Sequence, residues 1–389
     1  MIKVEEVKIR QILNSMGKKA FEVEMIANNH IKAIASSPSA IIPGRREVIE
    51  IGAVSKNKLN QIIKEICSRE IKNQEDFDKI LKTYLKELGS SICLPFSLAF
   101  ARIMAQAQNL TLVQYIAKLA NYNPKEISTI PLIAIFSGGV HNRKEKGSIQ
   151  NIMIAVDVHP FSKATQPITE IYTYIENEVK KKNLLNTYGA SSGMIVENMT
   201  IEEKFQIVTE AIKKLNYEKE VTIAIDVAAE HLFHEGNYIY QGKIMNANQL
   251  KEQLNQYIKK YRITYIEDPF DSNDKISWTN FKLEHKKINI IGDDLFATQE
   301  QYIDRNLADG ILLKMNQVGT LTDTIHTFRK AKKENMITCV SHRSVETEDT
   351  FMCDLAVALN SQYIKIGGPR RGDRIAKYNR LLRLEEEMK

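Results

Sequence analysis

The sequence predicts an α/β barrel preceded by an α+β domain, and two observations carry this prediction. From about residue 128 onward, short apolar stretches alternate with amphipathic stretches of helical length, which is the pattern of a parallel α/β barrel. Before that point, alternating stretches come first and helical stretches follow, as in an α+β domain. A chain of 389 residues is long enough for two domains, and we place them at residues 1–127 and 128–389.

The start of the chain is expected to form an antiparallel meander. The segments KVEEVKIRQIL and AFEVEMIANNHIKAIASS alternate apolar and polar residues, and NSMGKK and ANNH supply turns. From Ser55 to about Tyr122 apolar residues instead recur every three or four positions, so this region is predicted to be helical. Pro124 and the residues KEISTIP that follow it are predicted to link the two domains.

The strands of the predicted barrel end in polar residues. The expected strand segments are VTIAIDVA, ITYIEDPF, INIIGDDL, GILLKMN, ITCVSHRS and YIKIGG. The polar residues at their C-terminal ends are Asp226, Glu267, Asp293, Lys314, His342 and Lys365. Barrel enzymes build their active sites at this end of the strands, so the sequence predicts an active site there.

Three of these residues are carboxylates from successive strands. In a barrel Asp226, Glu267 and Asp293 would converge on one point, where their oxygens could bind a hard cation. A set of ligands that contains no His or Cys favours Mg²⁺ over zinc. The alternative is that each carboxylate caps a following helix or pairs with a nearby lysine.

Lys314 and Lys365 follow two later strands and are candidates for proton transfer. Desolvation and nearby positive charge both disfavour an ammonium group, so a lysine beside a divalent cation can have a depressed pKa and can remove a proton near neutral pH. The alternative is a lysine that extends from the strand end and pairs with a carboxylate.

The segment SHRSVETEDTF places His342, Arg343 and Ser344 in a row at another strand end. Arginine gives bidentate donors, so these residues would suit a phosphate or carboxylate. The alternative is a polar loop that leads into an acidic first helical turn. A metal, a lysine base and an anion site together describe proton abstraction next to a carboxylate, with the cation stabilising the ene-diolate.

Composition and charge exclude other classes of protein. The hydrophobic fraction of 43% and charged fraction of 26% are those of a soluble globular protein. The net charge of +6 has no basic block behind it, so no nucleic-acid partner is expected. No apolar run approaches the roughly 18 residues of a membrane helix, and MIKVEEVKIR lacks a signal peptide's apolar region. We therefore expect no membrane partner and a cytoplasmic location. The four widely spaced cysteines indicate buried thiols.

Several long motifs resemble the C-terminal half of enolases, the phosphopyruvate hydratases. They are YIEDPFDSNDKISW, GDDLFATQ, LLKMNQVGTLTDTI, SHRSVETEDTFMCDLAVAL and IKIGGPRRGDRIAKYNRLLRLEEE, and weaker similarity covers IRQILNSMGKKAFEVEM, GSSICLPFSLAFARIMA and PLIAIFSGGVH. The resemblance implies an N-terminal α+β domain, a TIM-like barrel with an unusual strand order at its start, dependence on Mg²⁺, a homodimer and a small phosphorylated carboxylate as substrate.

The resemblance also implies a role for individual residues. It makes Lys314 the base that abstracts the proton. It also implies that Asp226, Glu267 and Asp293 hold a catalytic metal and that Arg343 and Ser344 hold the substrate phosphate. Gln150 would contact the substrate, and Lys365 would contact the substrate carboxylate and the metal region. His342 would form part of the pocket wall, and His141 would be a histidine of a mobile loop.

Two departures from the family motifs concern the second half of the reaction. Asn151 and Ser191 stand where the resemblance implies glutamates, and the glutamate missing at Ser191 is the one that protonates the leaving hydroxyl. Loss of a general acid typically costs on the order of a hundred- to ten-thousandfold in rate. His141 and Glu197 are candidates for a replacement acid. In SSPSAIIPG, Ser37 or Ser39 is the counterpart of a ligand for a second metal.

Three functional hypotheses follow. The first is a divergent enolase that converts 2-phosphoglycerate to phosphoenolpyruvate. The second is an enolase-fold enzyme that keeps proton abstraction but performs a different second step on another carboxylate. The third is a non-catalytic paralog that acts as a binding or scaffold protein. The residues that are kept favour the hypotheses in this order, because a protein without catalysis has no reason to hold so many charges together.

Overall fold

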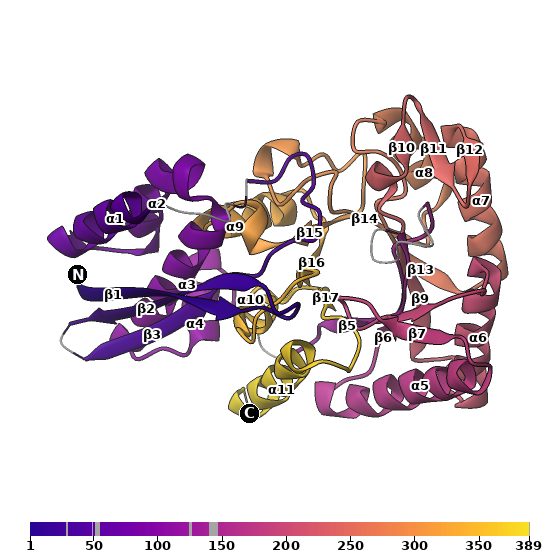
Figure 1. Cartoon of the computed structure of the whole chain (residues 1–389), viewed down its shortest axis with the longest axis horizontal. Coiled ribbons are helices and arrows are strands. Elements are labelled where there is room, and N and C mark those ends of the chain that lie inside the picture. Colours follow the sequence, from indigo (N-terminus) through magenta and orange to yellow (C-terminus); the bar gives the residue numbers. More distant parts are fainter. Residues whose placement is uncertain (29, 49, 51–54, 124–126, 140–146, 389) are drawn as a thin grey trace.

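The computed structural model describes the whole chain except residues 29, 49, 51–54, 124–126, 140–146 and 389. Its N-terminal lobe is a four-stranded sheet of order β3-β2-β1-β4 with helices packed beside it (Figure 1). The strands are β1 (Ile2–Leu13), β2 (Lys19–Ala27), β3 (Ile31–Ser36) and β4 (Glu70–Ile71), and the helices are α1 (Lys56–Ser68), α2 (Gln74–Leu88), α3 (Ser90–Ala107) and α4 (Leu112–Ala120).

The predicted meander is confirmed. β1 pairs antiparallel with β2, and β2 with β3. β4 was not predicted, because two residues are too short to show a periodic pattern. Local sequence explains two helix boundaries: the Asn73 side chain caps α2, and Thr111 and Gln114 form a capping box at the start of α4.

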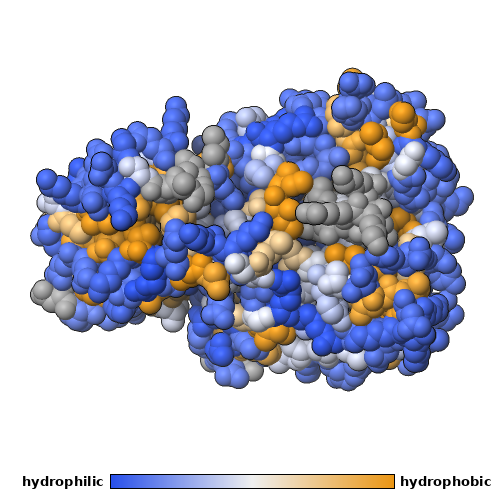
Figure 2. Space-filling model, viewed as in Figure 1, coloured by the Kyte–Doolittle hydropathy of each residue, from blue (hydrophilic) through white to orange (hydrophobic). Residues whose placement is uncertain are grey.

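One expectation about the N-terminal lobe was wrong. We expected no apolar run of this kind, but α3 has the length and apolar composition of a membrane span. Among the described residues, no other helix is long and apolar enough. However, 78% of that span is buried inside the protein. Figure 2 shows a largely hydrophilic surface broken by separate apolar patches on one face of the molecule.

The second part of the chain is a closed eight-stranded barrel, because β17 pairs with β5 as well as with β16. Its strands in spatial order are β5 (Ile130–Ser137), β6 (Asn151–Val156), β9 (Val221–Asp226), β13 (Ile263–Glu267), β14 (Asn289–Gly292), β15 (Gly310–Leu313), β16 (Ile337–Ser341) and β17 (Tyr363–Lys365). The helices are α5 (Phe161–Lys181), α6 (Ile201–Lys214), α7 (Ala247–Lys260), α8 (Lys275–Glu284), α9 (Leu321–Lys333), α10 (Phe351–Ala358) and α11 (Gly372–Glu387).

Several shorter elements accompany the barrel strands and helices. β7 (Leu185–Tyr188) pairs with β8 (Met194–Val196), which lies beside β5. A small separate sheet contains β10 (Phe233–His234), β11 (Asn237–Tyr240) and β12 (Lys243–Met245). Within the described residues, the 3₁₀ helices are η2 (Ala229–His231), η3 (Glu300–Tyr302) and η4 (Met315–Gln317).

The barrel departs from the predicted parallel pattern at one strand. β6 runs antiparallel to both β5 and β9, which gives the barrel the unusual start that the resemblance implies. The segment 138–150 between β5 and β6 lacks the amphipathic pattern of a crossover helix, and neighbouring strands joined without such a crossover run antiparallel.

The register of this irregular start aligns polar residues. Ser137 on β5 lies opposite Asn151 on β6, Asn151 lies opposite Asp226 on β9, and Asp226 lies opposite Glu267 on β13. An apolar cluster including Leu132, Met153, Tyr265 and Leu312 is also contributed by the barrel strands. The barrel therefore presents a continuous polar row across four strands.

The N-terminal lobe packs against the barrel near α9 and α10 (Figure 1). Arg102 on α3 forms a two-pronged ion pair with Asp349, which lies just before α10, at 2.9 and 2.7 Å. Thr322 at the start of α9 donates its backbone N–H to the buried Asp78 of α2. The predicted boundary at residues 127 and 128 stays a prediction.

Candidate active site

A cavity of about 60 Å³ lies where the barrel strands end. It is lined by the predicted residues Gln150, Asn151, Ser191, Asp226, Asp293, Lys314, His342, Arg343, Ser344 and Lys365. It is also lined by Ala40, Ile41, Ile42, Glu47, Ala228, His231, Asp268, Asp294 and Ser341, which the sequence did not single out.

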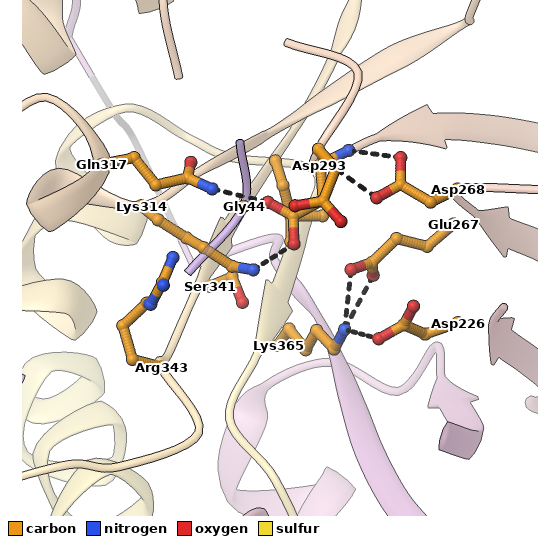
Figure 3. Close-up of polar contacts among 12 residues, drawn as sticks. Gly44, Asp226, Glu267, Asp268, Asp293, Lys314, Gln317, Ser341, Arg343 and Lys365 are labelled. Atoms are coloured by element: carbon orange, nitrogen blue, oxygen red, sulfur yellow. Dashed lines mark hydrogen bonds and ion pairs between the residues drawn. The ribbon is translucent and has the colours of Figure 1, made fainter. Parts of the chain in front are cut away.

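Lys365 binds two of the three predicted metal-binding carboxylates (Figure 3). Its Nζ donates to Asp226 Oδ2 and to both oxygens of Glu267, each at 2.8 Å. Burial lowers the pKa of Lys365, but the two carboxylates raise it more, so the net shift is upward. The alternative in which a strand-end lysine pairs with a carboxylate therefore describes Lys365 as it stands here.

Lys314 forms an ion pair with Asp293, the third predicted carboxylate. The other oxygen of Asp293 accepts a hydrogen bond from Gln317 at 2.9 Å, and Thr298 accepts one from the Lys314 backbone N–H at 2.9 Å. Burial lowers the pKa of Lys314, but the charge of Asp293 outweighs it and raises the pKa overall. The net direction is therefore opposite to the depression expected for a lysine beside a divalent cation.

Two further aspartates join Asp293. Asp268 accepts the backbone N–H groups of Asp293 and Asp294 at 2.9 and 2.8 Å. Among the described residues, Asp268, Asp293 and Asp294 bring carboxylate oxygens within 4.8 Å of one another. Burial and the neighbouring carboxylates raise the pKa values of Asp268 and Asp294. Oxygen donors of this kind suit Mg²⁺, and the adjacent acids in EDP and GDD were the signal that could have found them.

The two positions that lack the implied glutamates form one buried neutral corner. Asn151 Oδ1 accepts from Ser191 at 3.2 Å and from Ser137 at 3.4 Å, and the two serine hydroxyls are 3.2 Å apart. Asn151 Nδ2 donates to Asp226 at 3.3 Å, and Gln150 Nε2 donates to the same oxygen at 3.2 Å. Sequence reasoning missed Ser137, whose position depends on the β5–β6 register.

The predicted anion site is already engaged by protein groups. Arg343 donates from Nη1 and Nη2 to Glu47 at 3.0 and 2.7 Å, and Ser344 Oγ accepts the Ile41 backbone N–H at 3.0 Å. The sequence carries no signal for the Glu47–Arg343 pair, whose members lie 296 positions apart.

His342 is buried behind this site, and Arg374 Nη1 lies 2.7 Å from its Nδ1. Burial and the positive charge of Arg374 both lower the pKa of His342, so the imidazole is neutral. Arg374 is a second contact that sequence reasoning missed.

The remaining candidates lie elsewhere or outside the described residues. His141 falls outside them. Glu197 accepts a hydrogen bond from Asn186 at 2.8 Å beside the β7–β8 hairpin and is not among the residues that line the cavity. Ser39 pairs through its backbone with Val345, and the Ser37 hydroxyl donates to Pro38.

Comparison with known proteins identifies the family. The description "Enolase, N-terminal domain" matches residues 4–116, and "Enolase, C-terminal TIM barrel domain" matches residues 125–389. The chain is 33% identical to the enolase of Ehrlichia canis (strain Jake) over 412 residues, with 100% of this chain and 97% of the relative covered. It is 34% identical to the enolase of Ehrlichia chaffeensis over 411 residues (99% and 96% covered) and 31% identical to that of Helicobacter pylori strain J99 over 417 residues (100% and 97% covered). On this full-length similarity, the chain belongs to the enolase family.

Proposed function

We propose that the chain is a Mg²⁺-dependent lyase that converts 2-phosphoglycerate to phosphoenolpyruvate and water. The observation that carries this proposal is the largely buried Lys314, which points into a carboxylate-rich cavity and is ion-paired with Asp293 (Figure 3). In the proposed reaction Lys314 removes the proton from carbon 2, next to the substrate carboxylate. Full-length similarity to proteins named enolase supports the same assignment.

The carboxylates fit a hard cation. Asp226, Glu267 and Asp293 would hold Mg²⁺, and Asp268 and Asp294 add oxygens beside Asp293. Bound there, the cation would neutralise charge that develops on the substrate carboxylate. Lys365 holds Asp226 and Glu267 in position and would contact the substrate carboxylate.

The other predicted residues would bind the rest of the substrate. Arg343 and Ser344 would bind its phosphate, because guanidinium and hydroxyl groups suit its oxygens. Gln150 lines the cavity and would contact the substrate, and the neutral His342 would form part of the wall. His141 is proposed as a further catalytic group from the family resemblance.

The neutral corner favours a second candidate function. Ser137, Asn151 and Ser191 offer hydroxyl and amide groups but no carboxylic acid for the departing hydroxide. An enolase-fold enzyme with a different second step would keep Lys314 and the metal site and would need no acid here. A non-catalytic scaffold is the least favoured candidate, since buried charges are costly to keep together.

Nuclear magnetic resonance in D₂O separates these candidates. Purified protein, Mg²⁺ and 2-phosphoglycerate would be followed for deuterium uptake at carbon 2 and for phosphoenolpyruvate. We expect both signals. Exchange without product would favour the different second step, and neither signal from a folded, Mg²⁺-binding protein would overturn the lyase proposal.

We extend the proposal to assembly and location by analogy with the family. The chain would act as a homodimer in the cytoplasm, with no nucleic-acid or membrane partner. Sedimentation of the purified protein would test the dimer, and a monomer at micromolar concentration would contradict it.

A further inference from the structure

A loop of the N-terminal lobe closes the cavity over the anion site. This rim loop, residues 37–48, contributes Ala40, Ile41, Ile42 and Glu47 to the cavity wall. The rim loop is tied to the segment that contains Arg343 and Ser344. Its Ser39 exchanges backbone hydrogen bonds of 2.8 and 3.1 Å with Val345, and its Ile41 N–H donates to Ser344.

The strongest tie is the ion pair between Glu47 and Arg343. Both side chains are nearly buried, at 3% and 5% exposed. The two oxygens of Glu47 match the Nη1 and Nη2 ends of the guanidinium, which is the fork geometry by which arginine binds carboxylate and phosphate. Glu47 Oε1 also accepts from the Gly44 backbone at 3.0 Å and from Gln317 at 3.3 Å. The carboxylate of Glu47 is therefore held where an anionic ligand of Arg343 would sit.

We propose that Glu47 is a specificity-determining residue that occupies the anion subsite until a phosphate group displaces it. This inference rests on the proposed function of Arg343 as the residue that binds the substrate phosphate. A tethered carboxylate acts at a high effective concentration, so a free carboxylate of the same charge and shape gains nothing by replacing it. A phosphate dianion carries more charge and a third acceptor oxygen, and it can displace Glu47. The site thereby selects phosphorylated ligands over simple carboxylates.

The way the cavity is filled supports this inference. Glu47 already binds both Nη atoms of Arg343 at the cavity wall, so this carboxylate has to move before an anion can bind Arg343 in the same way. Glu47 belongs to a loop that other polar contacts also hold in place. Arg45 forms ion pairs with Glu230 and Asp271, and Arg46 donates to the backbone of Leu295 and Ser272. The apparent affinity for phosphate is then reduced by the fraction of molecules in which Glu47 still occupies Arg343.

Isothermal titration calorimetry with inorganic phosphate, and separately with malonate, tests the inference without turnover. The Glu47→Gln variant should bind phosphate roughly tenfold more tightly than the wild type, as expected if about one molecule in ten has a free subsite. Malonate binding should become measurable in the same variant. Glu50→Gln is the matched control, because Glu50 lies near the same loop but binds Ala40 and Asn316 instead of Arg343. Unchanged or weaker phosphate binding by folded Glu47→Gln would overturn the inference.

A second measurement uses the wild-type chain, in case the variant does not fold. Arg45 and Arg46 lie in the rim loop, so trypsin cleavage after them reports release of the loop. Inorganic phosphate should accelerate this cleavage severalfold, and an unchanged rate at saturating phosphate would contradict displacement of Glu47.

The two proposals fail in different ways. Tighter phosphate binding by Glu47→Gln together with no deuterium exchange in the wild type would remove the lyase proposal and keep this one. Exchange in the wild type with no effect of Glu47→Gln would do the opposite. Adding Arg343→Met to Glu47→Gln should abolish the gain in phosphate affinity. If the double variant still binds phosphate more tightly than the wild type, phosphate binds elsewhere and the inference is overturned.

Discussion

Ser191 donates a 3.2 Å hydrogen bond to the amide oxygen of Asn151, although the two residues lie 40 positions apart. Both stand where the family resemblance implies glutamates, so the two losses meet in one buried corner. Lys314 and Asp293 also line the cavity. The residue proposed to abstract the proton is thus present while neutral groups stand where the resemblance implies acids, and each part can be tested separately.

Ser191→Glu should raise the rate of phosphoenolpyruvate formation relative to exchange at carbon 2. A restored general acid typically contributes on the order of a hundred- to ten-thousandfold. Because Ser191 is buried against Ser137 and Asn151, the longer side chain will fit with difficulty and the gain will be reduced. Coupled product assays and exchange measured on the same sample would check it. Ser191→Gln matches the size without the acid, and an equal gain in that variant would rule out acid catalysis as the cause.

Lys314→Met should slow deuterium exchange at carbon 2 by on the order of a hundredfold or more, because it removes the proposed base. The exposed Lys287→Met is a matched control and should exchange at the wild-type rate. Exchange by a folded Lys314→Met protein at the wild-type rate would show that another group abstracts the proton.

The pH dependence of exchange should respond to Mg²⁺. The charge of Asp293 raises the pKa of Lys314, so the ammonium persists at neutral pH and exchange should increase as pH rises. A cation near the ammonium disfavours its charged form and should move the pH profile to lower values. Profiles measured at increasing Mg²⁺ would test this, and a shift to higher pH would contradict it.

Mg²⁺ should stabilise the protein through Asp293. A ligand at a hundred times its dissociation constant adds about 2.7 kcal/mol to the free energy of unfolding. Urea denaturation with and without Mg²⁺ should show this increment in the wild type and lose it in Asp293→Asn. The highly exposed Glu235→Gln should keep it; an increment that persists in Asp293→Asn would place the cation elsewhere.

Arg102→Met should destabilise the contact between the N-terminal lobe and the barrel by about 3 kcal/mol, because it leaves Asp349 largely buried without its cation. Burial raises the pKa of Asp349, but Arg102 lowers it more, so its folded-state pKa lies below the ordinary value. The ion pair therefore contributes to the free energy of unfolding above about pH 4, and this contribution is lost as pH falls through the folded-state pKa of Asp349.

Urea unfolding of the wild type and of Arg102→Met at several pH values would measure this effect. The difference in the free energy of unfolding between the two proteins should shrink as pH falls below about 4. Arg102→Met combined with Asp349→Asn should recover part of the loss, and a difference that grows toward low pH would contradict the assignment.

Local pattern was sufficient to predict most of the architecture. Alternation predicted β1 to β3, helical spacing predicted the helices between Ser55 and Tyr122, and apolar runs ending in polar residues predicted the barrel strands from β9 onward. Lys314 and Asp293 could be named for the same reason, because a polar residue at the end of an apolar strand is visible within a few positions. The presence of Asn151 and Ser191 where the resemblance implies glutamates was also visible from the motifs.

Only the tertiary structure decided which of these groups touch. Distant segments of the chain meet in three places. β6 runs antiparallel to β9, Lys365 pairs with Asp226 and Glu267, and Glu47 forms an ion pair with Arg343. Strand direction and long-range ion pairs depend on how whole elements pack, and a local pattern of residues contains no information about them. The sequence by itself therefore determined the fold class and about half of the residues that line the candidate site. The packing of the rim loop and the barrel determined the remaining residues and the partners of all of them, because those contacts form only when the chain is folded.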